Sequence, residues 1–321
     1  MNDSRPVTEP TRQKVLAAVE ALNYRPRSAA RHGVRAGRSI GIVIKERGNP
    51  FFAEIADGAA RCARESGYTV FTASSEGDFS AETEIIQNLQ RRDIDGLIIY
   101  PVMNEQTDLT NLVELRRARM PFVLMEHILG VKAHTVDVNL LAASKAAVKH
   151  LIEGGHRRIV HFAGPSYSQH SDDRIAAMRH AFSESELAFS DRMVIKAGAR
   201  MEDGYRAACE YLEAVSEKRK ATAATCFNDL VAIGVARALR EHGLRVPEDV
   251  SLIGCDGIDL LDYMPTPLTT IRTPHREMGA RAAKILIDQV EGNTQPDIQK
   301  VSFEPEFLVR GSTRPLEPSD T

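Results

Sequence analysis

The sequence has no Trp and only 4 Cys in its 321 residues. The cysteines are far apart (Cys62, Cys209, Cys226 and Cys255) and form no Cys-x-x-Cys pair, which excludes a disulfide scaffold and favours reduced thiols in a cytoplasmic protein. No apolar run approaches the roughly 18 residues that a bilayer span needs, so no membrane partner is expected. The first residues lack the apolar stretch of a secretory signal. A hydrophobic content of 43% with 26% charged residues excludes wholesale disorder.

The net charge of −3 hides an uneven distribution of charge. The first 40 residues hold eight basic and three acidic side chains, a net of +5, and the remainder holds 33 basic and 41 acidic ones, a net of −8. A basic arm on an acidic body suggests a polyanionic partner for the arm. A solvated basic tail is the alternative that charge alone leaves open.

From residue 39 onward, short β-rich runs alternate with helical patterns. Several runs are continuous Val, Ile and Leu, as in parallel strands that are covered on both faces. Apolar residues recur at helical spacing in residues 52–64 and 141–152, and a helix is expected at 278–290. This alternation predicts a doubly wound α/β fold, and the length suggests two domains. The expected strands are 40–44, 68–73, 96–100, 122–125, 158–163, 193–196, 223–227 and 250–254, with β-rich runs at 268–274 and 301–310.

The first 40 residues differ from the rest of the chain. Thr8 is a good helix N-cap with Pro10 in the first turn, and apolar residues at helical spacing predict a short helix over 10–22. Pro26 interrupts the pattern. A segment with one strong helix cannot build a core of its own.

The common enzyme motifs are absent from the sequence. There is no Gly-x-Gly-x-x-Gly after the first strand, no Gly-x-x-x-x-Gly-Lys-[Ser/Thr], no Gly-x-Ser-x-Gly and no His-Glu-x-x-His. His156 and His161 are five positions apart, which is the wrong spacing for one metal-ligand face. The sequence therefore predicts no enzyme, no metal and no cofactor.

Polar and aromatic residues follow several expected strands, at the sheet edge where open α/β folds bind ligands. Phe51 and Phe52 could present a flat face to a sugar or base, or pack in the core. Asn228 could bond a ligand hydroxyl or cap the next helix. Asp256 offers an acceptor, and Arg174 offers a bidentate donor or a surface salt bridge. Their shared position after strands of both halves predicts a ligand site.

Six segments of the chain carry a specific resemblance: NPFFAEI (49–55), GHRRIVHFAGP (155–165), FNDLVAIG (227–234), RVPEDVSLIGCDG (245–257), PLTTIRTP (267–274) and MGARAAKILID (278–288). Together they resemble the lactose-repressor/galactose-repressor (LacI/GalR) family of bacterial regulators. The resemblance implies a periplasmic-binding-protein-like core of two Rossmann-like subdomains joined by three crossovers, a small effector between them, and a homodimer. It also implies that Phe51 and Phe52 stack on the effector, that Arg174 holds sugar hydroxyls or a purine, and that Asn228 and Asp256 add polar contacts.

The resemblance also implies a domain division and shows two departures. The expected parts are a headpiece with hinge (1–38), a core (39–314) and a tail (315–321). Within the core, the first subdomain would hold 39–138 and 272–298, and the second 139–267 and 302–314; crossovers would fall near 138–139, 267–271 and 298–302. The family often has Phe-Asp-Asp where this chain has Cys255-Asp256-Gly257. Residues 6–26 resemble the third helix of the family's DNA-binding headpiece, and the two preceding helices, about 20 residues, have no counterpart.

These departures bear on DNA binding. The position of the hinge leucine that wedges into a base step falls on Gly33 or Val34, and glycine cannot wedge. The chain as printed is therefore expected to bind DNA only weakly, with cationic side chains contacting phosphates. These are Arg27, Arg31, Arg35 and Arg38.

The leading hypothesis is an effector-responsive transcriptional repressor that binds a small molecule, a sugar or nucleobase-like compound, and operator DNA in its complete form. The alternative is a stand-alone sugar-binding sensor without sequence-specific DNA binding. An enzyme on the same fold is a third hypothesis, which the missing motifs disfavour.

Overall fold

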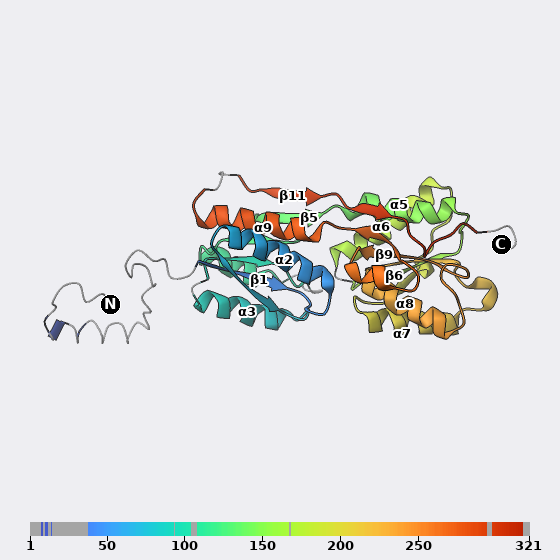
Figure 1. Cartoon of the computed structure of the whole chain (residues 1–321), viewed down its shortest axis with the longest axis horizontal. Coiled ribbons are helices and arrows are strands. Elements are labelled where there is room, and N and C mark those ends of the chain that lie inside the picture. The colour runs from blue at the N-terminus through green and yellow to red at the C-terminus, as the bar shows by residue number, and fades with distance from the viewer. Residues whose placement is uncertain are drawn as a thin grey trace.

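The computed structural model describes residues 38–316 apart from positions 93, 104–107, 167 and 294–296, together with Thr8, Pro10, Thr11 and Lys14. The expected helix over 10–22 lies outside the described residues except for Pro10, Thr11 and Lys14, which are helical. The hinge up to residue 37 and the tail from residue 317 also lie outside them. The described body forms two lobes side by side (Figure 1).

The first lobe is built on a parallel sheet in the order β11-β5-β4-β3-β1-β2. Helices α2 (Pro50–Glu65) and α9 (His275–Val290) pack against each other and cover one face, and α3 (Phe79–Arg91) lies on the other (Figure 1). Helix α4 (Thr110–Arg117) precedes β4. The strands are β1 (Ser39–Ile44), β2 (Thr69–Ser74), β3 (Gly96–Ile99), β4 (Phe122–Leu124), β5 (His134–Val138) and β11 (Lys300–Phe303).

The second lobe repeats this plan with the order β12-β10-β9-β8-β6-β7, in which only β12 is antiparallel. Helices α5 and α6 pack together, as do α7 and α8. The strands are β6 (Ile159–Ala163), β7 (Val194–Lys196), β8 (Ala223–Cys226), β9 (Ser251–Asp256), β10 (Thr269–Arg272) and β12 (Glu306–Leu308). The helices are α5 (Leu140–Glu153), α6 (Gln169–Glu184), α7 (Met201–Ala214), α8 (Asp229–Glu241) and the 3-10 turns η1 (Asp191–Met193), η2 (Glu217–Arg219) and η3 (Asp259–Tyr263).

The apolar strand runs account for this architecture. Strand β1 pairs in parallel with β2 and β3, and its residues from Ile40 to Ile44 are buried because helices cover both faces of the sheet. The predicted doubly wound α/β class is confirmed, and each of the eight expected strands is present to within one or two residues. Strand β5 was not predicted, because its run His-Thr-Val-Asp-Val is short and interrupted by polar residues.

Helix α2 shows how local sequence positions an element. Asn49 caps it by accepting a hydrogen bond from the Phe51 backbone N–H at 3.0 Å, and Pro50 occupies the first turn. The helix then crosses α9 so closely that a Cβ on Gly279 would clash with the carbonyl of Ile55. The close crossing holds the start of α2 against the sheet edge.

The chain passes between the two sheets three times, but two passages lie elsewhere than expected. Residues 269–272 form β10, which pairs with β9 in the second lobe, so the second passage follows residue 272 instead of 267–271. The expectation that 301–310 belongs wholly to the second lobe is wrong, because β11 pairs in parallel with β5 of the first lobe. Only β12 joins the second sheet, so the third passage falls between residues 303 and 306.

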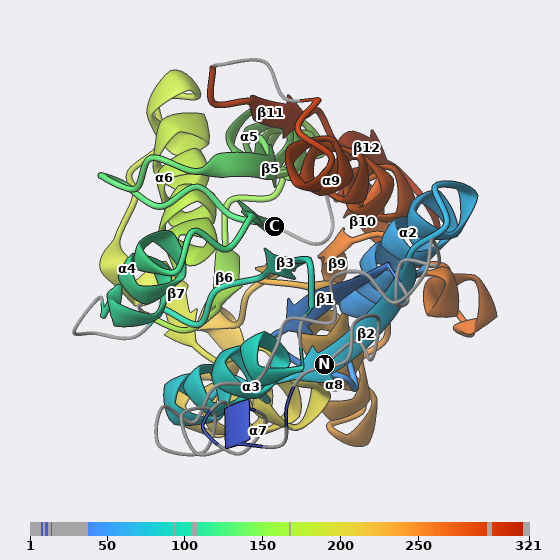
Figure 2. The same ribbon diagram turned by 90° about the vertical axis from the view of Figure 1, so that its left-hand side faces the viewer.

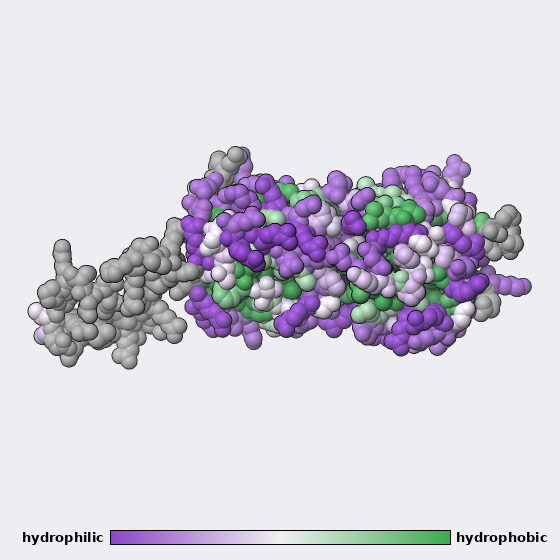
Figure 3. All heavy atoms as spheres, viewed as in Figure 1, coloured by the Kyte–Doolittle hydropathy of each residue, from purple (hydrophilic) through white to green (hydrophobic). Residues whose placement is uncertain are grey.

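The surface of the described body is mostly polar. Hydrophilic residues cover most of the visible face of both lobes (Figure 3). Among the described residues, no helix is both long and apolar enough to cross a membrane.

Candidate functional site

A cleft of about 680 Å³ lies between the two lobes. The strands of each sheet that point into it are parallel, so their carboxyl ends face the cleft from both sides. Five residues proposed from sequence line this one cleft, although they come from four separate parts of the chain. They are Phe51, Phe52, Arg174, Asn228 and Asp256.

The wall of the first lobe is aromatic. Phe51 and Phe52, in the first turn of α2, contact each other edge to face with their ring centroids 5.0 Å apart. Both also contact Tyr100, directly after β3, at 5.8 and 5.1 Å, and Phe51 meets the ring of His275 at 4.8 Å. The two phenylalanines are largely buried yet line the cleft. Packing in the core, one of the two sequence interpretations, is therefore observed, while contact of the rings with a sugar or base stays a prediction.

Arg174 lies in the second turn of α6 and is buried at the wall of the second lobe. Its Nη1 donates to the carbonyl oxygen of His170 at 2.8 Å, and its Nη2 donates to Cys255 Sγ at 3.2 Å. The guanidinium covers the ring of Phe227 at 4.6 Å from the centroid. Within the described part of the chain, its buried Nε has no partner and no carboxylate pairs with it. The surface salt bridge considered from sequence is therefore wrong.

Asp256 ends strand β9 with a φ of 119°, a backbone conformation that few side chains adopt. Burial and the nearby Asp229 carboxyl raise the pKa of Asp256 well above its ordinary value, and Arg174 opposes this. Asp229 is itself committed to structure, since its carboxylate accepts hydrogen bonds from the backbone N–H groups of Gly257 and Ile258 and from another side chain. No described group donates to the Asp256 carboxylate, so its acceptors are free at the cleft.

Asn228 has mainly a structural role in this arrangement. Its Oδ1 caps α8 by accepting from the Val231 backbone N–H at 2.8 Å, as one of the two sequence interpretations has it. Its Nδ2 donates to the carbonyl oxygen of Ala199 at 2.9 Å. Asn228 lines the cleft, and the second N–H of its amide makes no hydrogen bond with a described residue.

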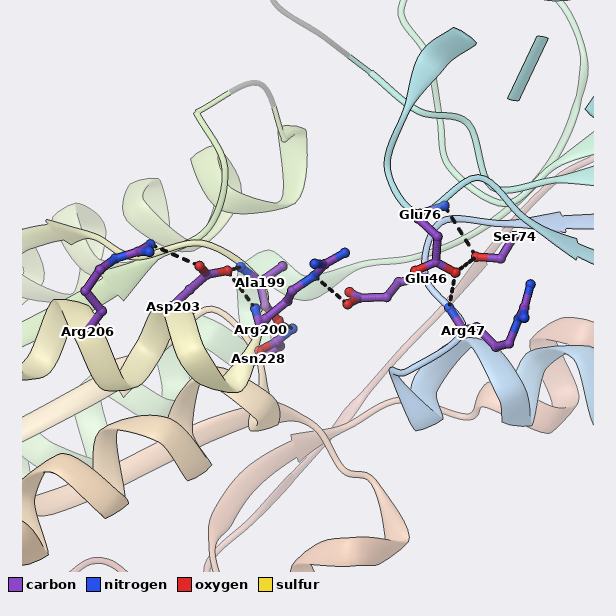
Figure 4. Close-up of polar contacts among 9 residues, drawn as sticks. All are labelled: Glu46, Arg47, Ser74, Glu76, Ala199, Arg200, Asp203, Arg206 and Asn228. Atoms are coloured by element: carbon purple, nitrogen blue, oxygen red, sulfur yellow. Dashed lines mark hydrogen bonds and ion pairs between the residues drawn. The ribbon is translucent and has the colours of Figure 1, made fainter. Parts of the chain in front are cut away.

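An ion pair joins the two lobes across the cleft (Figure 4). Glu46, two residues past β1, accepts from Arg200 Nε at 2.7 Å, and Arg200 is the N-cap of α7. Asp203 Oδ2 accepts from the Arg200 backbone N–H at 3.1 Å and so holds that residue in place. Burial raises the pKa of Glu46, Arg200 lowers it and the nearby Glu76 raises it. The two lobes are therefore connected by a charge pair as well as by the backbone.

A second polar group lies beside Arg174. Both ring nitrogens of His170 are buried without a hydrogen-bond partner in the described residues, and Nε2 is 3.7 Å from Asp137 Oδ1 of the first lobe. Burial lowers the pKa of His170, while the Glu126 and Asp137 carboxylates raise it. Glu126 is buried and paired with Lys45 Nζ at 2.7 Å.

The residues expected to contact DNA are mostly outside the described part: Arg27, Arg31 and Arg35. Arg38 is described, and its guanidinium is engaged with the body. Its Nη1 donates to the Ser66 carbonyl oxygen at 3.0 Å and lies 2.9 Å from Glu291 Oε1, and the group covers the ring of Tyr68. Its contact with phosphate stays a prediction.

Sequence reasoning missed Tyr100, Glu46, Glu126 and His170. The signal that would have found the first three was present, because each follows a strand of the first sheet within two residues. Apart from Phe51 and Phe52, the residues proposed from sequence all lie in the second lobe. His170 carried no such signal, since it lies inside a helix and reaches the cleft through the packing of α6.

This arrangement of two α/β lobes around a shared cleft is that of the periplasmic-binding-protein-like proteins, and residues 148–313 match the family described as a periplasmic binding protein-like domain. The chain is 33% identical to the HTH-type transcriptional repressor PurR of Aliivibrio fischeri, covering 97% of this chain and 92% of that protein. It therefore belongs to the LacI/GalR family of transcriptional regulators, whose members are not enzymes.

Solved structures agree with this assignment. The transcriptional regulator CelR in complex with cellobiose superposes with a TM-score of 0.77 at 26% identity, covering 97% of this chain and 92% of that one. A LacI family regulator from Enterococcus faecium with bound ribose has a TM-score of 0.75 at 26% identity, covering 87% and 100%.

Proposed function

We propose that the protein is an effector-responsive DNA-binding repressor whose effector is a small polyhydroxylated molecule, a sugar, bound in the cleft between the lobes. One observation carries the proposal: a buried guanidinium group, Arg174, and a buried carboxyl group, Asp256, line the cleft wall that faces Phe51 and Phe52. A donor and an acceptor beside aromatic rings suit hydroxyl groups and an apolar sugar face. The ribose and cellobiose in the related structures support a sugar over a nucleobase.

Each predicted residue has a role in this proposal. Phe51 and Phe52 stack on the ligand from the first lobe. Arg174 donates to ligand oxygens, and Asp256 accepts from ligand hydroxyls. The remaining N–H of Asn228 donates one further hydrogen bond.

The effector acts by shifting the relative arrangement of the lobes. Because the ligand contacts both walls, it favours the arrangement in which they are close, and in a homodimer this sets the spacing of the two arms. The arms then contact operator DNA in the cytoplasm through Arg27, Arg31, Arg35 and Arg38. The repressor names of the relatives support this part of the proposal.

The ligand part is tested by thermal-shift and calorimetric titration with ribose, cellobiose and purine bases. A ligand at 100 times its Kd stabilises the fold by about 2.7 kcal/mol, which raises the melting temperature by several degrees. Arg174→Met keeps the apolar cover on Phe227 and should weaken binding at least tenfold. Arg179→Met is the matched control, since Arg179 lies on the same helix in an exposed pair with Asp191. Equal loss in both variants would refute the assignment.

The DNA part is tested separately by gel shift with DNA from upstream of the protein's own gene, with and without the sugar. We expect DNA binding that weakens as the salt concentration rises and that alanine substitution of Arg27, Arg31 and Arg35 reduces. Binding that these substitutions leave unchanged would contradict that expectation. Sugar binding without any DNA effect would instead support the stand-alone sensor.

A further inference from the structure

A second pocket, of about 420 Å³, lies in the first lobe away from the cleft. It is lined by the last turn of α4 and the turn after it, by the residues that precede or begin β4 and β5, by the last turn of α9 and by Ile298. The strands of this sheet are parallel, so this is the edge opposite to the one that faces the cleft. Figure 2 views the molecule from this end. We call it the basic pocket, after Arg116, Arg119 and Lys132 in its lining.

The charge of the basic pocket is of one sign. Arg116, Arg119 and Lys132 line it, and no carboxylate does. None of the three forms an ion pair with any described residue. They stand on a body whose net charge outside the first 40 residues is −8. Unpaired like charges around one cavity repel each other, and an anion in the cavity would relieve that repulsion.

A histidine adds a neutral donor with a defined orientation. His134 is 9% exposed, and its Nδ1 accepts a hydrogen bond from the Gln299 backbone N–H at 3.1 Å. The proton of the neutral ring is therefore on Nε2, which has no partner in the described part of the chain. Burial lowers the pKa of His134, so the ring is neutral near pH 7. The buried Oε1 of Gln289, also in the lining, has no partner among described residues either.

We propose that the basic pocket binds a phosphate group. Two guanidinium groups offer paired donors that match phosphate oxygens, Lys132 adds a point charge, and the His134 Nε2–H adds a fixed donor. The phosphate belongs either to a small metabolite or to the nucleic-acid backbone, and the chemistry of recognition is the same. The site is separate from the cleft and does not depend on its ligand.

The position of the pocket gives this binding a consequence. Gln289 is two residues before Glu291, which caps α9 and pairs with Arg38 at 2.9 Å. Arg38 is where the N-terminal arm enters β1. A phosphate in the pocket would therefore act on the end of the core that carries the arm, whereas the effector acts on the opposite sheet edge.

The experiment uses the full chain with pyrophosphate as probe, at constant ionic strength, by calorimetry and thermal shift. The variant Arg116→Gln/Lys132→Gln should weaken pyrophosphate binding at least tenfold. The control Arg117→Gln, one residue along α4 and outside the lining, should leave it unchanged. Sugar binding in the cleft should be equal in all three proteins, which separates failure here from failure of the proposed function.

A random-sequence DNA duplex provides the second arm. Loss of both pyrophosphate and duplex binding in the double variant would identify the nucleic-acid backbone as the source of the phosphate, and loss of pyrophosphate binding alone would identify a small metabolite. The proposal is overturned if sulfate and chloride at equal ionic strength act like pyrophosphate and the control loses as much as the variant, or if pyrophosphate binding does not respond to the double substitution.

Discussion

Breaking the interlobe ion pair Glu46–Arg200 should weaken effector binding, because the pair helps to hold the two lobes together. The pair joins one lobe to the other, so its free energy adds to the stability of this arrangement of the lobes. The Arg200 side chain is 52% exposed and that of Glu46 is 17% exposed, so solvent screens the attraction. Pairs of this kind contribute about 0.2–1 kcal/mol. At RT of about 0.6 kcal/mol, Arg200→Gln should weaken the sugar affinity at most about fivefold.

The ion pair is diagnosed by the coupling energy between the two substitutions, and not by the effect of either substitution alone. Both residues also line the cleft, so neither Glu46→Gln nor Arg200→Gln is interpreted alone. In a double-mutant cycle, Glu46→Gln and Arg200→Gln should together cost less than the sum of their separate effects on the Kd. The coupling should shrink in 1 M salt. It should also vanish at low pH, because Glu46 takes up a proton as the pH falls through its raised pKa and the charge pair is then lost.

The control for this experiment is Arg206→Gln. Arg206 pairs with Asp203 at 3.0 Å on the same helix as Arg200 but within one lobe (Figure 4). It should leave the Kd unchanged and show no coupling to Glu46→Gln. Strict additivity of Glu46→Gln and Arg200→Gln at low salt and neutral pH would refute the reasoning.

Three further predictions concern stability. Between pH 8 and pH 5, the free energy of unfolding of His161→Phe should rise by about 2 kcal/mol relative to that of the wild type. Burial lowers the pKa of His161 to about 3, whereas the unfolded chain binds the proton near 6.5, so acid destabilises only the wild type. A constant difference between the two proteins in denaturant melts at both pH values would contradict this. Gly279→Ala should lower the free energy of unfolding by about 1–3 kcal/mol, because the added methyl group clashes at the α2–α9 crossing. Gly48→Ala, with open space around it, should leave the free energy of unfolding nearly unchanged in the same denaturant melts. Lys45→Met should lower the free energy of unfolding by about 3 kcal/mol, because it leaves Glu126 buried and unpaired. Lys45→Met/Glu126→Leu should recover most of this loss. No recovery would show that Lys45 does not stabilise the fold through its pairing with Glu126.

Much of the architecture can be read from local patterns. Residues 40–44 have no polar side chain at any position, and a strand tolerates this only when both of its faces are covered. The short strand β5 escapes the same reasoning, because Asp137 and His134 interrupt it and its pairing with β4 and β11 supplies the stability. The split of residues 301–310 between two sheets was missed for a related reason, since the sheet is selected by pairing of β11 with β5 and of β12 with β10, which are both distant in the chain.

The candidate site likewise depends partly on local sequence and partly on tertiary packing. The residue types at the ends of strands indicate where a ligand could bind, because the carboxyl ends of parallel strands converge in any doubly wound sheet. They do not indicate that Arg200 crosses the cleft to Glu46, or that Arg174 rests on Phe227, because those contacts depend on how two lobes face each other.

Local sequence is sufficient for the alternation of strands and helices, for the cap at Asn49 and for the uneven charge of arm and body, because each depends on neighbours in the chain or on composition. Only the tertiary structure decides which polar groups find partners. Asn228 is occupied by its helix cap while the Asp256 carboxylate is free, and Arg116, Arg119 and Lys132 gather around one cavity without an acid. The physical reason is that burial and distance set the strength of a charge or hydrogen bond, and both are properties of the packed chain.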